Sequence, residues 1–280
     1  MKIRELLGVT RERLSSAGID EAGLEAELLL RHALRQDAVH FFLDFETELS
    51  SQQEQLLNTL VERRLSGEPL AYITGKREFY GLEFTVNPRV LIPRPETEHI
   101  VDKTLELVKQ IPSPVIADIG TGSGVIAVSL AVNLPHARIY AVDISPKALE
   151  TARDNAERHG VESRIVFLLG DLAAPLPEPV DILIANLPYV KSSDCVTSPE
   201  PHQALDGGKY GLDVIERLCG GLKGKLKPGG WALLEIGQGQ EEAVNGLLVA
   251  ALPSSSIETI KDLAGIERVV CACLLITAKV

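Results

Sequence analysis

Cysteine is scarce in this sequence, and its histidines are scattered. Four cysteines occur in 280 residues. Cys271 and Cys273 alternate within "RVVCACLLI", which predicts that both lie on one face of a strand. Cys195 and Cys219 have no partner at metal-ligand spacing, and the six histidines form no HxxxH pair. The sequence therefore disfavours both a disulfide framework and a metal centre.

Long apolar runs are missing as well. No segment approaches the roughly 20 consecutive apolar residues that cross a bilayer. The N-terminus, "MKIRE", turns amphipathic at once and lacks the apolar core of a signal peptide. We therefore expect a cytoplasmic protein that does not associate with a membrane.

An excess of positive charge is the third absence. The chain has 28 basic and 39 acidic residues, which gives a net charge of −11. Affinity for nucleic acid comes largely from Lys and Arg side chains that neutralise phosphates. Direct binding of nucleic acid is therefore not expected.

Three regions follow one another along the chain. Residues 1–70 have helical spacing of apolar residues, with Ser50 and Ser51 as candidate N-caps, and predict a helical domain without visible chemistry. Residues 71–92 contain short β-like runs between glycines and predict a β-hairpin linker. Residues 93–280 begin with a helix and form the third region. We interpret the first region as either a structural lid or a domain that docks a partner.

The third region alternates predicted strands with helices, which is typical of a parallel, doubly wound α/β sheet. Only "KDLAGIE" separates the last two strands, too little for a helical crossover, so this pair is predicted to be antiparallel. The expected strands are 114–119, 138–142, 164–169, 181–185, 230–236, 255–260 and 268–277. The sequence therefore predicts an α/β fold with a seven-stranded sheet whose last strand is reversed.

A glycine-rich turn follows the first of these strands. "DIGTGSG" places glycines where the chain bends from strand to helix, so a ligand can approach the backbone at a helix N-terminus. The spacing is GxGxG because Val125 follows Gly124, and Asp118 precedes the loop, where it would repel a pyrophosphate. An NAD-dependent oxidoreductase is therefore disfavoured, and a cofactor with a cationic amino acid part is favoured.

Acidic residues end the next two strands. Asp143 follows Gly124 by nineteen residues and is placed to accept hydrogen bonds from ribose hydroxyls. Asp171 ends the third strand, where it could meet an adenine amino group, and Leu172 could pack on the adenine face. Three neighbouring strand ends therefore predict one nucleoside pocket at the carboxyl edge of the sheet.

These segments resemble class I S-adenosylmethionine-dependent methyltransferases. "DIGTGSG", "VDIS" and "LKPGGW" resemble motifs of that class, and so does the antiparallel pair at the end of a Rossmann-like sheet. The resemblance implies S-adenosyl-L-methionine as cofactor and S-adenosyl-L-homocysteine as product. The predicted cofactor-binding residues are Asp118, Gly120, Thr121, Gly122, Ser123, Gly124, Asp143, Asp171, Leu172 and Asn186.

The fourth strand ends in "IANLPYV". A planar amide or amino nitrogen is a poor nucleophile because its lone pair is delocalised, so two acceptors that hold both of its N–H bonds would orient it for attack. The Asn186 side-chain oxygen and the Leu187 main-chain carbonyl are the predicted acceptors. Pro188 favours an extended conformation at Leu187, and Tyr189 could stack on the planar group. These four residues are the predicted catalytic and substrate-binding set.

Other segments resemble one family in particular. "LAYITGKREFYGLEF", "VLIPRPETE", "NLPYV" and "EPHQALDGGKYGLDVIERL" are together similar to the PrmC/HemK family of protein-glutamine N5-methyltransferases, over residues 3–277. The resemblance implies methylation of the glutamine in the Gly-Gly-Gln loop of class 1 peptide chain release factors. It also implies that residues 1–70 dock the release factor.

Three positions depart from the family pattern. Leu187 stands where the first proline is usual, although the carbonyl that the chemistry needs is retained. Leu172 stands where Trp or Phe is common, and Tyr210 where Asp is usual. Two alternatives remain open: an amino-methyltransferase acting on a ribosomal-protein glutamine or a nucleobase, and a binding module with an inactive methyltransferase fold.

Overall fold

The computed structural model describes residues 1–276 and contains two compact units, Met1–Lys76 and Arg77–Val280. The expected last strand ends at residue 277, and the expected methyltransferase domain ends at residue 280. Residues 277–280 lie outside the described residues. The expected domain boundaries after residues 70 and 92 stay predictions. No helix of residues 1–276 is long and apolar enough to cross a membrane.

The first unit is helical. Its elements are α1 (Ile3–Ser16), α2 (Ala22–Leu34), α3 (Ala38–Leu43), α4 (Ser51–Leu65) and α5 (Leu70–Thr74). Of the two candidate N-caps of α4, the structure uses Ser50, whose hydroxyl accepts the Gln53 N–H while the Gln53 side chain accepts the Ser50 N–H. Apolar faces of these helices form one core around the fully buried Leu14, Leu29 and Phe41.

The expected hairpin linker is shorter than predicted. Strands β1 (Lys76–Phe79) and β2 (Leu82–Thr85) are joined by Tyr80 and Gly81, which both have positive φ, as a two-residue hairpin turn of type I′ requires. Residues 71–74 belong to α5 instead, because Pro69 precedes that single turn of helix and Gly75, with φ of 71°, ends it.

The second unit contains the expected seven-stranded sheet. Its strands are β3 (Val115–Ile119), β4 (Arg138–Asp143), β5 (Ile165–Leu169), β6 (Val180–Ala185), β7 (Leu226–Glu235), β8 (Ser255–Lys261) and β9 (Glu267–Leu274). Their order is β5-β4-β3-β6-β7-β9-β8, and β9 is antiparallel to both of its neighbours. The predicted fold class, including the reversed last strand, is confirmed.

Strand β7 begins earlier than predicted. Residues "LKPGGW" belong to the strand, not to a turn before it, and its register with β6 shifts between Val180 and Ile182. Gly230 permits this arrangement, since a Cβ there would lie 2.9–3.1 Å from the carbonyl oxygens of Lys227, Asp181 and Val180. Glycine in a strand therefore marks a close backbone approach here and does not end the strand.

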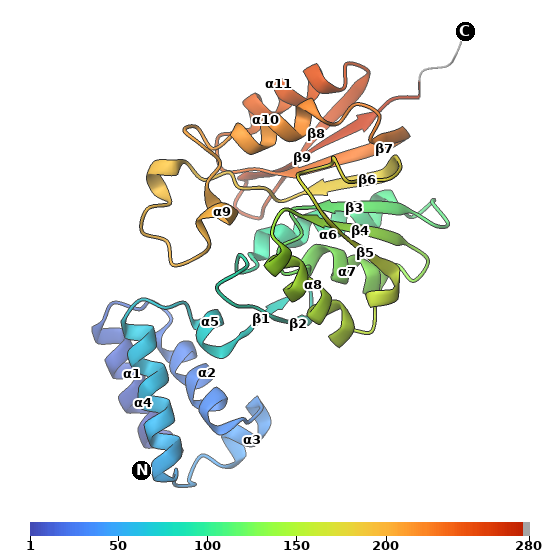
Figure 1. Cartoon of the computed structure of the whole chain (residues 1–280). Coiled ribbons are helices and arrows are strands. Elements are labelled where there is room, and N and C mark those ends of the chain that lie inside the picture. Colours follow the sequence, from blue (N-terminus) through green and yellow to red (C-terminus); the bar gives the residue numbers. More distant parts are fainter. Residues whose placement is uncertain (277–280) are drawn as a thin grey trace. The chain divides into compact units, whose positions relative to one another are not determined.

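Helices cover both faces of the sheet (Figure 1). One core cluster packs α6 (Glu98–Leu107) and α7 (Val125–Asn133) against the sheet, beside α8 (Pro146–Arg158). The other packs α10 (Asp213–Gly220) and α11 (Glu241–Ala251) against the opposite face. The remaining elements are η1 (Pro95–Thr97), η2 (Glu162–Arg164), η3 (Ser192–Asp194) and α9 (His202–Leu205). Because parallel strands carry helices on both sides, the loops at their carboxyl ends are free to form a site.

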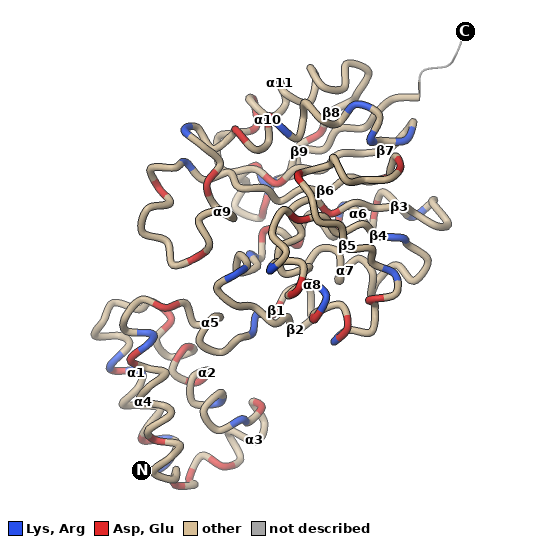
Figure 2. The backbone as a smooth tube through the Cα atoms, in the orientation of Figure 1, with Lys and Arg blue, Asp and Glu red and all other residues tan. Residues whose placement is uncertain are grey.

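Charges of both signs alternate along the chain. Figure 2 shows Lys and Arg interspersed with Asp and Glu over both units. Many of them are paired, for example Arg64 with Glu25 in the first unit and Lys227 with Asp181 in the second. Acidic side chains therefore accompany the basic ones in both units.

Candidate active site

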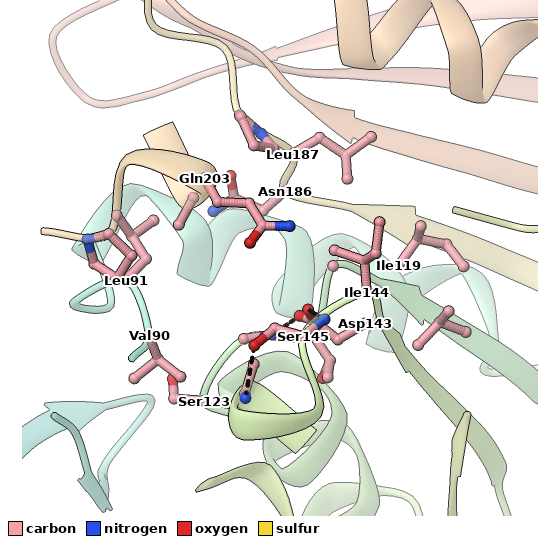
Figure 3. A pocket seen from close by; sticks show the side chains of 18 of the residues that line it. Val90, Leu91, Ile119, Ser123, Asp143, Ile144, Ser145, Asn186, Leu187 and Gln203 are labelled. Atoms are coloured by element: carbon pink, nitrogen blue, oxygen red, sulfur yellow. Dashed lines mark hydrogen bonds between the residues drawn. The ribbon is translucent and has the colours of Figure 1, made fainter. Parts of the chain in front are cut away.

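A cavity of about 350 Å³ lies at the carboxyl ends of β3, β4, β5 and β6. Its wall includes the loop after each of these strands, the segment 89–97 and residues 201–206. In Figure 3, Asn186 and Leu187 lie on one side of the pocket, and Asp143 and Ser145 on the other. The predicted strand ends therefore meet at one pocket, whose volume is in the range of small-molecule sites.

The glycine loop forms the floor of the cavity. Gly120, Gly122 and Gly124 have φ of 75°, 56° and 81°, a region that glycine adopts without strain. A Cβ on Gly120 would lie 3.1 Å from the Leu187 side chain, and one on Gly124 would lie 3.0 Å from the Cβ of Ala152 in α8. The glycines therefore permit both the bend and the close approach of the fourth strand end. Thr121 and Ser123 also line the cavity.

Asp118 lies beneath this loop and outside the pocket lining. Its Oδ2 accepts a hydrogen bond of 2.6 Å from the Thr121 hydroxyl, while its Oδ1 is buried and has no hydrogen-bond partner within residues 1–276. Burial raises the pKa of Asp118 to about 7, and the nearby Asp143 adds to the rise. The site thus contains a buried acceptor oxygen that a cation could satisfy.

Asp143 connects two loops of the site. Its Oδ2 accepts the Gly122 N–H at 2.9 Å and its Oδ1 accepts the Ser145 N–H at 2.8 Å. Burial raises the pKa of this carboxyl, although these backbone N–H groups oppose the rise. A carboxylate offers about four acceptor positions, so two remain for a ligand. Asp143 therefore organises the pocket and retains the capacity for the predicted contacts with ribose.

Asp171 and Leu172 both line the cavity. The Asp171 carboxylate, which the sequence suggested for an adenine amino group, is half exposed and paired with the guanidinium of Arg217. Leu172 has φ of 50°, an uncommon backbone conformation for a residue with a side chain. Arg217 was not predicted as a site residue, because a basic residue on a helix usually only indicates a solvated face.

Asn186 is held in one orientation by Thr97. Its Nδ2 donates a hydrogen bond of 3.0 Å to the Thr97 hydroxyl oxygen. Within residues 1–276 the Asn186 side chain makes no other hydrogen bond. Its carboxamide oxygen thereby remains available as an acceptor at the cavity, which Asn186, Leu187, Pro188 and Thr97 all line. Leu187 is buried and packs into the core, which restrains this turn without a proline at position 187.

Tyr189 points away from the cavity and does not line it. Its hydroxyl donates to Oε1 of the buried Glu235 at 3.3 Å. Burial, with the nearby Glu235 carboxylate, raises the pKa of Tyr189 above its ordinary value. In this arrangement the Tyr189 ring does not face the cavity. Its stacking on a planar substrate therefore stays a prediction.

Two amide side chains that the sequence did not single out support the site: Asn155, which is buried, and Gln240, which is half-buried. Asn155, on the apolar face of α8, accepts the Thr85 N–H and donates to the carbonyls of Thr85 and Ser123. Gln240 donates to the carbonyls of Tyr189 and Gly211, at 3.0 and 3.1 Å. Asn155 had one visible signal, since it is a polar residue at an apolar position of the helical repeat.

A charged pair links two walls of the cavity. Glu200 is largely buried, accepts the Ile92 N–H at 2.9 Å and pairs with the Arg94 guanidinium.

Among residues 1–276 there is no group of three or more His, Cys, Asp or Glu side chains suited to hold a metal ion. The lining of the site therefore combines hydrogen-bond acceptors, backbone N–H groups, apolar walls and the guanidinium groups of Arg89, Arg94 and Arg217.

Two family models match the chain. The PrmC N-terminal domain matches residues 5–75, and a methyltransferase domain matches residues 113–234. Together they cover the helical unit and most of the sheet.

Curated relatives match over nearly the whole chain. The release factor glutamine methyltransferase of Moorella thermoacetica is 42% identical over 274 residues, which is 96% of this chain and 97% of that protein. Those of Geobacter sulfurreducens and Bacillus anthracis are 41% and 34% identical, and cover 96% and 97% of this chain and 95% and 99% of their own length.

Solved structures resemble the fold at lower identity. A methyltransferase from Pyrococcus furiosus matches with a TM-score of 0.53 at 20% identity, over 77% of this chain and 98% of that one. A ribosomal protein L11 methylase from Lactobacillus delbrueckii matches with a TM-score of 0.52 at 20% identity, over 68% and 84%. These similarities concern the fold alone.

Proposed function

This chain belongs to the family of release factor glutamine methyltransferases, and from that premise we propose which reaction its site performs. The enzyme transfers a methyl group from S-adenosyl-L-methionine to the side-chain amide nitrogen of a glutamine, the one in the Gly-Gly-Gln motif of class 1 peptide chain release factors. The observation that carries this proposal is the Asn186 carboxamide, whose nitrogen is engaged by Thr97 so that its oxygen is available at a cavity beside a glycine loop.

The residues at the glycine loop fit S-adenosyl-L-methionine. The Asp118 carboxyl beneath the loop suits its cationic amino acid part through charge, and the free acceptor positions of Asp143 suit ribose hydroxyls. Leu172 and Asp171 would border the adenine, and Gly120 and Gly122 allow close approach to the backbone. When bound, this cofactor supplies a methyl group on a positively charged sulfur, and S-adenosyl-L-homocysteine is the product.

The fourth strand end orients the substrate nitrogen. Asn186 Oδ1 and the Leu187 carbonyl would accept the two N–H bonds of the glutamine amide and stabilise the positive charge that develops on its nitrogen. Pro188 favours the extended conformation at Leu187 that presents this carbonyl. The chemistry needs no strong side-chain base, because the methylated amide nitrogen is acidic enough to lose its proton once the methyl group has been transferred.

The helical unit is assigned to docking of the release factor. It has its own core around Leu14, Leu29 and Phe41, so it does not depend on the sheet for an apolar interior. Side chains of Val39, Phe42 and Leu43 on α3 are exposed, and an exposed apolar cluster supports a role in protein recognition.

The proposed substrate can be tested directly. The full chain is incubated with methyl-labelled S-adenosyl-L-methionine and, in separate reactions, with class 1 release factors, ribosomal proteins, ribosomal RNA and DNA. We expect label on the release factor and none on a release factor whose Gly-Gly-Gln glutamine is replaced by alanine. Label on a ribosomal protein or a nucleic acid, without label on the release factor, would reject the proposal in favour of the related amino-methyltransferases.

The cofactor assignment predicts the effect of Asp143→Ala. Hydrogen bonds to charged groups contribute about 1.5–3 kcal/mol, so this change is expected to raise the Kd for S-adenosyl-L-homocysteine about 10- to 100-fold. Titration calorimetry measures this constant. Asp154→Ala, at an exposed position of α8, is the matched control and should leave the Kd unchanged. An unaltered Kd in Asp143→Ala would contradict the assignment.

A further inference from the structure

We propose that Thr97 and Glu235 are positioning residues that fix the orientation of the Asn186 carboxamide, so that its oxygen and not its nitrogen faces the substrate amide. This inference rests on the proposed function. The inference adds two residues to the proposed function, and neither contacts the reacting atoms. It also assigns to the Glu235 charge the control of the direction in which the Asn186 carboxamide points.

The first step concerns the symmetry of a carboxamide. Rotation by half a turn about its last bond exchanges the oxygen and the nitrogen of Asn186 with little change in shape. In the other orientation the Asn186 NH2 group would face the NH2 group of the substrate glutamine, and two donors would meet. The hydrogen bond from Asn186 Nδ2 to Thr97 Oγ1, 3.0 Å long, selects the productive orientation.

The second step concerns the Thr97 hydroxyl, which can donate as well as accept. If it donated to Asn186, it would hold the wrong orientation. Thr97 is buried, and the carboxyl of Glu235, which is buried at the end of β7, lies near enough for the Thr97 hydroxyl to favour its charged form. A carboxylate only accepts hydrogen bonds, so a Thr97 hydroxyl that turns its proton toward Glu235 keeps lone pairs of Oγ1 for Asn186 Nδ2.

The third step concerns the cost of this carboxylate. Glu235 Oε1 accepts from the Tyr189 hydroxyl, but its Oε2 is buried and has no hydrogen-bond partner within residues 1–276. A buried charge that lacks partners destabilises a fold, and an uncharged side chain of similar size would be less costly. Stability therefore does not explain why position 235 carries a carboxylate. The need for a group beside Thr97 that only accepts hydrogen bonds does explain it.

The groups that face Glu235 come from three elements. Glu96 and Thr97 belong to η1, Tyr189 follows β6, and Arg268 lies on β9, where it also pairs with Asp262. Burial raises the pKa of Glu235 to about 7, and the negative charge of Glu96 adds to the rise. The hydroxyls of Thr97 and Tyr189 and the positive charge of Arg268 oppose it.

Protonation of Glu235 reverses the chain of hydrogen bonds. A protonated carboxyl can donate to Thr97 Oγ1, which frees the Thr97 hydroxyl to donate to the Asn186 oxygen. The unproductive orientation of Asn186 then becomes accessible. Methyl transfer should therefore decline as the pH falls through the pKa of Glu235 and rise as the pH increases through it.

Variants of Thr97 test the first two steps. Thr97→Val keeps the shape but removes the acceptor, and is expected to lower kcat for methylation of the release factor about 10- to 100-fold, as for groups that orient a ligating side chain. Affinity for S-adenosyl-L-homocysteine should not change. Thr97→Ser restores the hydroxyl and should restore most of kcat. Thr104→Val is the matched control and should keep wild-type kcat. Thr104 is also buried, but within residues 1–276 its hydroxyl bonds only to the Ile100 carbonyl in α6.

Glu235→Gln tests the third step through the pH profile of kcat. Measurement at saturating S-adenosyl-L-methionine keeps the titration of Asp118 out of the profile. We expect a rise centred near pH 7 in the wild type and a profile without that rise in Glu235→Gln. Its melting temperature at pH 8 should equal or exceed that of the wild type, because a costly buried charge is gone.

The outcomes separate this inference from the function on which it rests. If wild-type enzyme does not label the release factor, the proposed function fails. If it does, and Thr97→Val keeps wild-type kcat or the rise near pH 7 persists in Glu235→Gln, the positioning role fails alone. If Thr97→Val does not fold, the test rests on Thr97→Ser and Glu235→Gln. The role is supported if Thr97→Ser loses less than tenfold in kcat and the rise of kcat near pH 7 disappears in Glu235→Gln. It is overturned if that rise persists in Glu235→Gln.

Discussion

Replacement of Asn186 by alanine is expected to lower the rate of methyl transfer to the release factor about 10²- to 10³-fold, the loss typical when one preorganised polar group at a reacting centre is removed. The carboxamide oxygen is the acceptor that the structure leaves available at the cavity, and Thr97 holds it there. Without it, the amide nitrogen loses both orientation and stabilisation of its developing charge.

The effect should be confined to the chemical step. Single-turnover transfer measures the rate, and calorimetry with S-adenosyl-L-homocysteine should give a nearly unchanged Kd, since Asp118 and Asp143 are not altered. Asn133→Ala provides a control, because Asn133 is exposed at the end of α7 and, among the described residues, its side chain donates only to the Ser129 carbonyl. A wild-type rate in Asn186→Ala would remove Asn186 from the proposed reaction.

The second large effect is expected from Gly211→Ala. Gly211 has φ of 74°, and a Cβ there would lie 2.2 Å from the Tyr189 carbonyl oxygen and 2.7 Å from Gln240 Nε2. These are the two atoms whose hydrogen bond secures the residue after Pro188. Two effects should add in Gly211→Ala and lower its free energy of unfolding. Backbone strain contributes roughly 1–2 kcal/mol and overpacking contributes roughly 1–3 kcal/mol.

Gly224→Ala separates strain from overpacking. Gly224 has nearly the same φ, 75°, but nothing lies within 4 Å of a Cβ placed there. Urea unfolding should therefore show a loss of about 1–2 kcal/mol in this variant and a larger loss in Gly211→Ala. Only Gly211→Ala should also reduce methyl transfer, because it displaces the strand end that carries Asn186. Equal losses of stability in the two variants would contradict this account.

Much of the fold follows from local patterns along the chain. The alternation of apolar strands with amphipathic helices predicted the seven-stranded sheet, and the short "KDLAGIE" connection predicted its reversed strand. Two boundaries differ from the expectation, the start of the strand expected at 230–236 and the start of the β-like segment expected at 71–92. "LKPGGW" continues β7 through a register shift, and residues 71–74 form a helical turn, because close backbone approach and capping decided those positions.

The pocket was predictable for a different reason. Parallel strands bring their carboxyl ends to one edge, so residues that end β3, β4, β5 and β6 meet whatever their separation in the sequence. The chain itself thus determined that the glycine loop, Asp143, Asp171 and Asn186 share a cavity.

Only the tertiary structure decided how Asn186 is oriented and what stands behind it. Thr97 is 89 residues from Asn186, and Glu235 is 46 residues from Tyr189. Along the chain, Thr97 reads as the start of a helix and Glu235 as the polar end of a strand. Tyr189, predicted to face the substrate, turns toward Glu235 instead. A sequence pattern specifies which residues end a strand, but the direction of a polar side chain there depends on partners that only folding brings within hydrogen-bond distance.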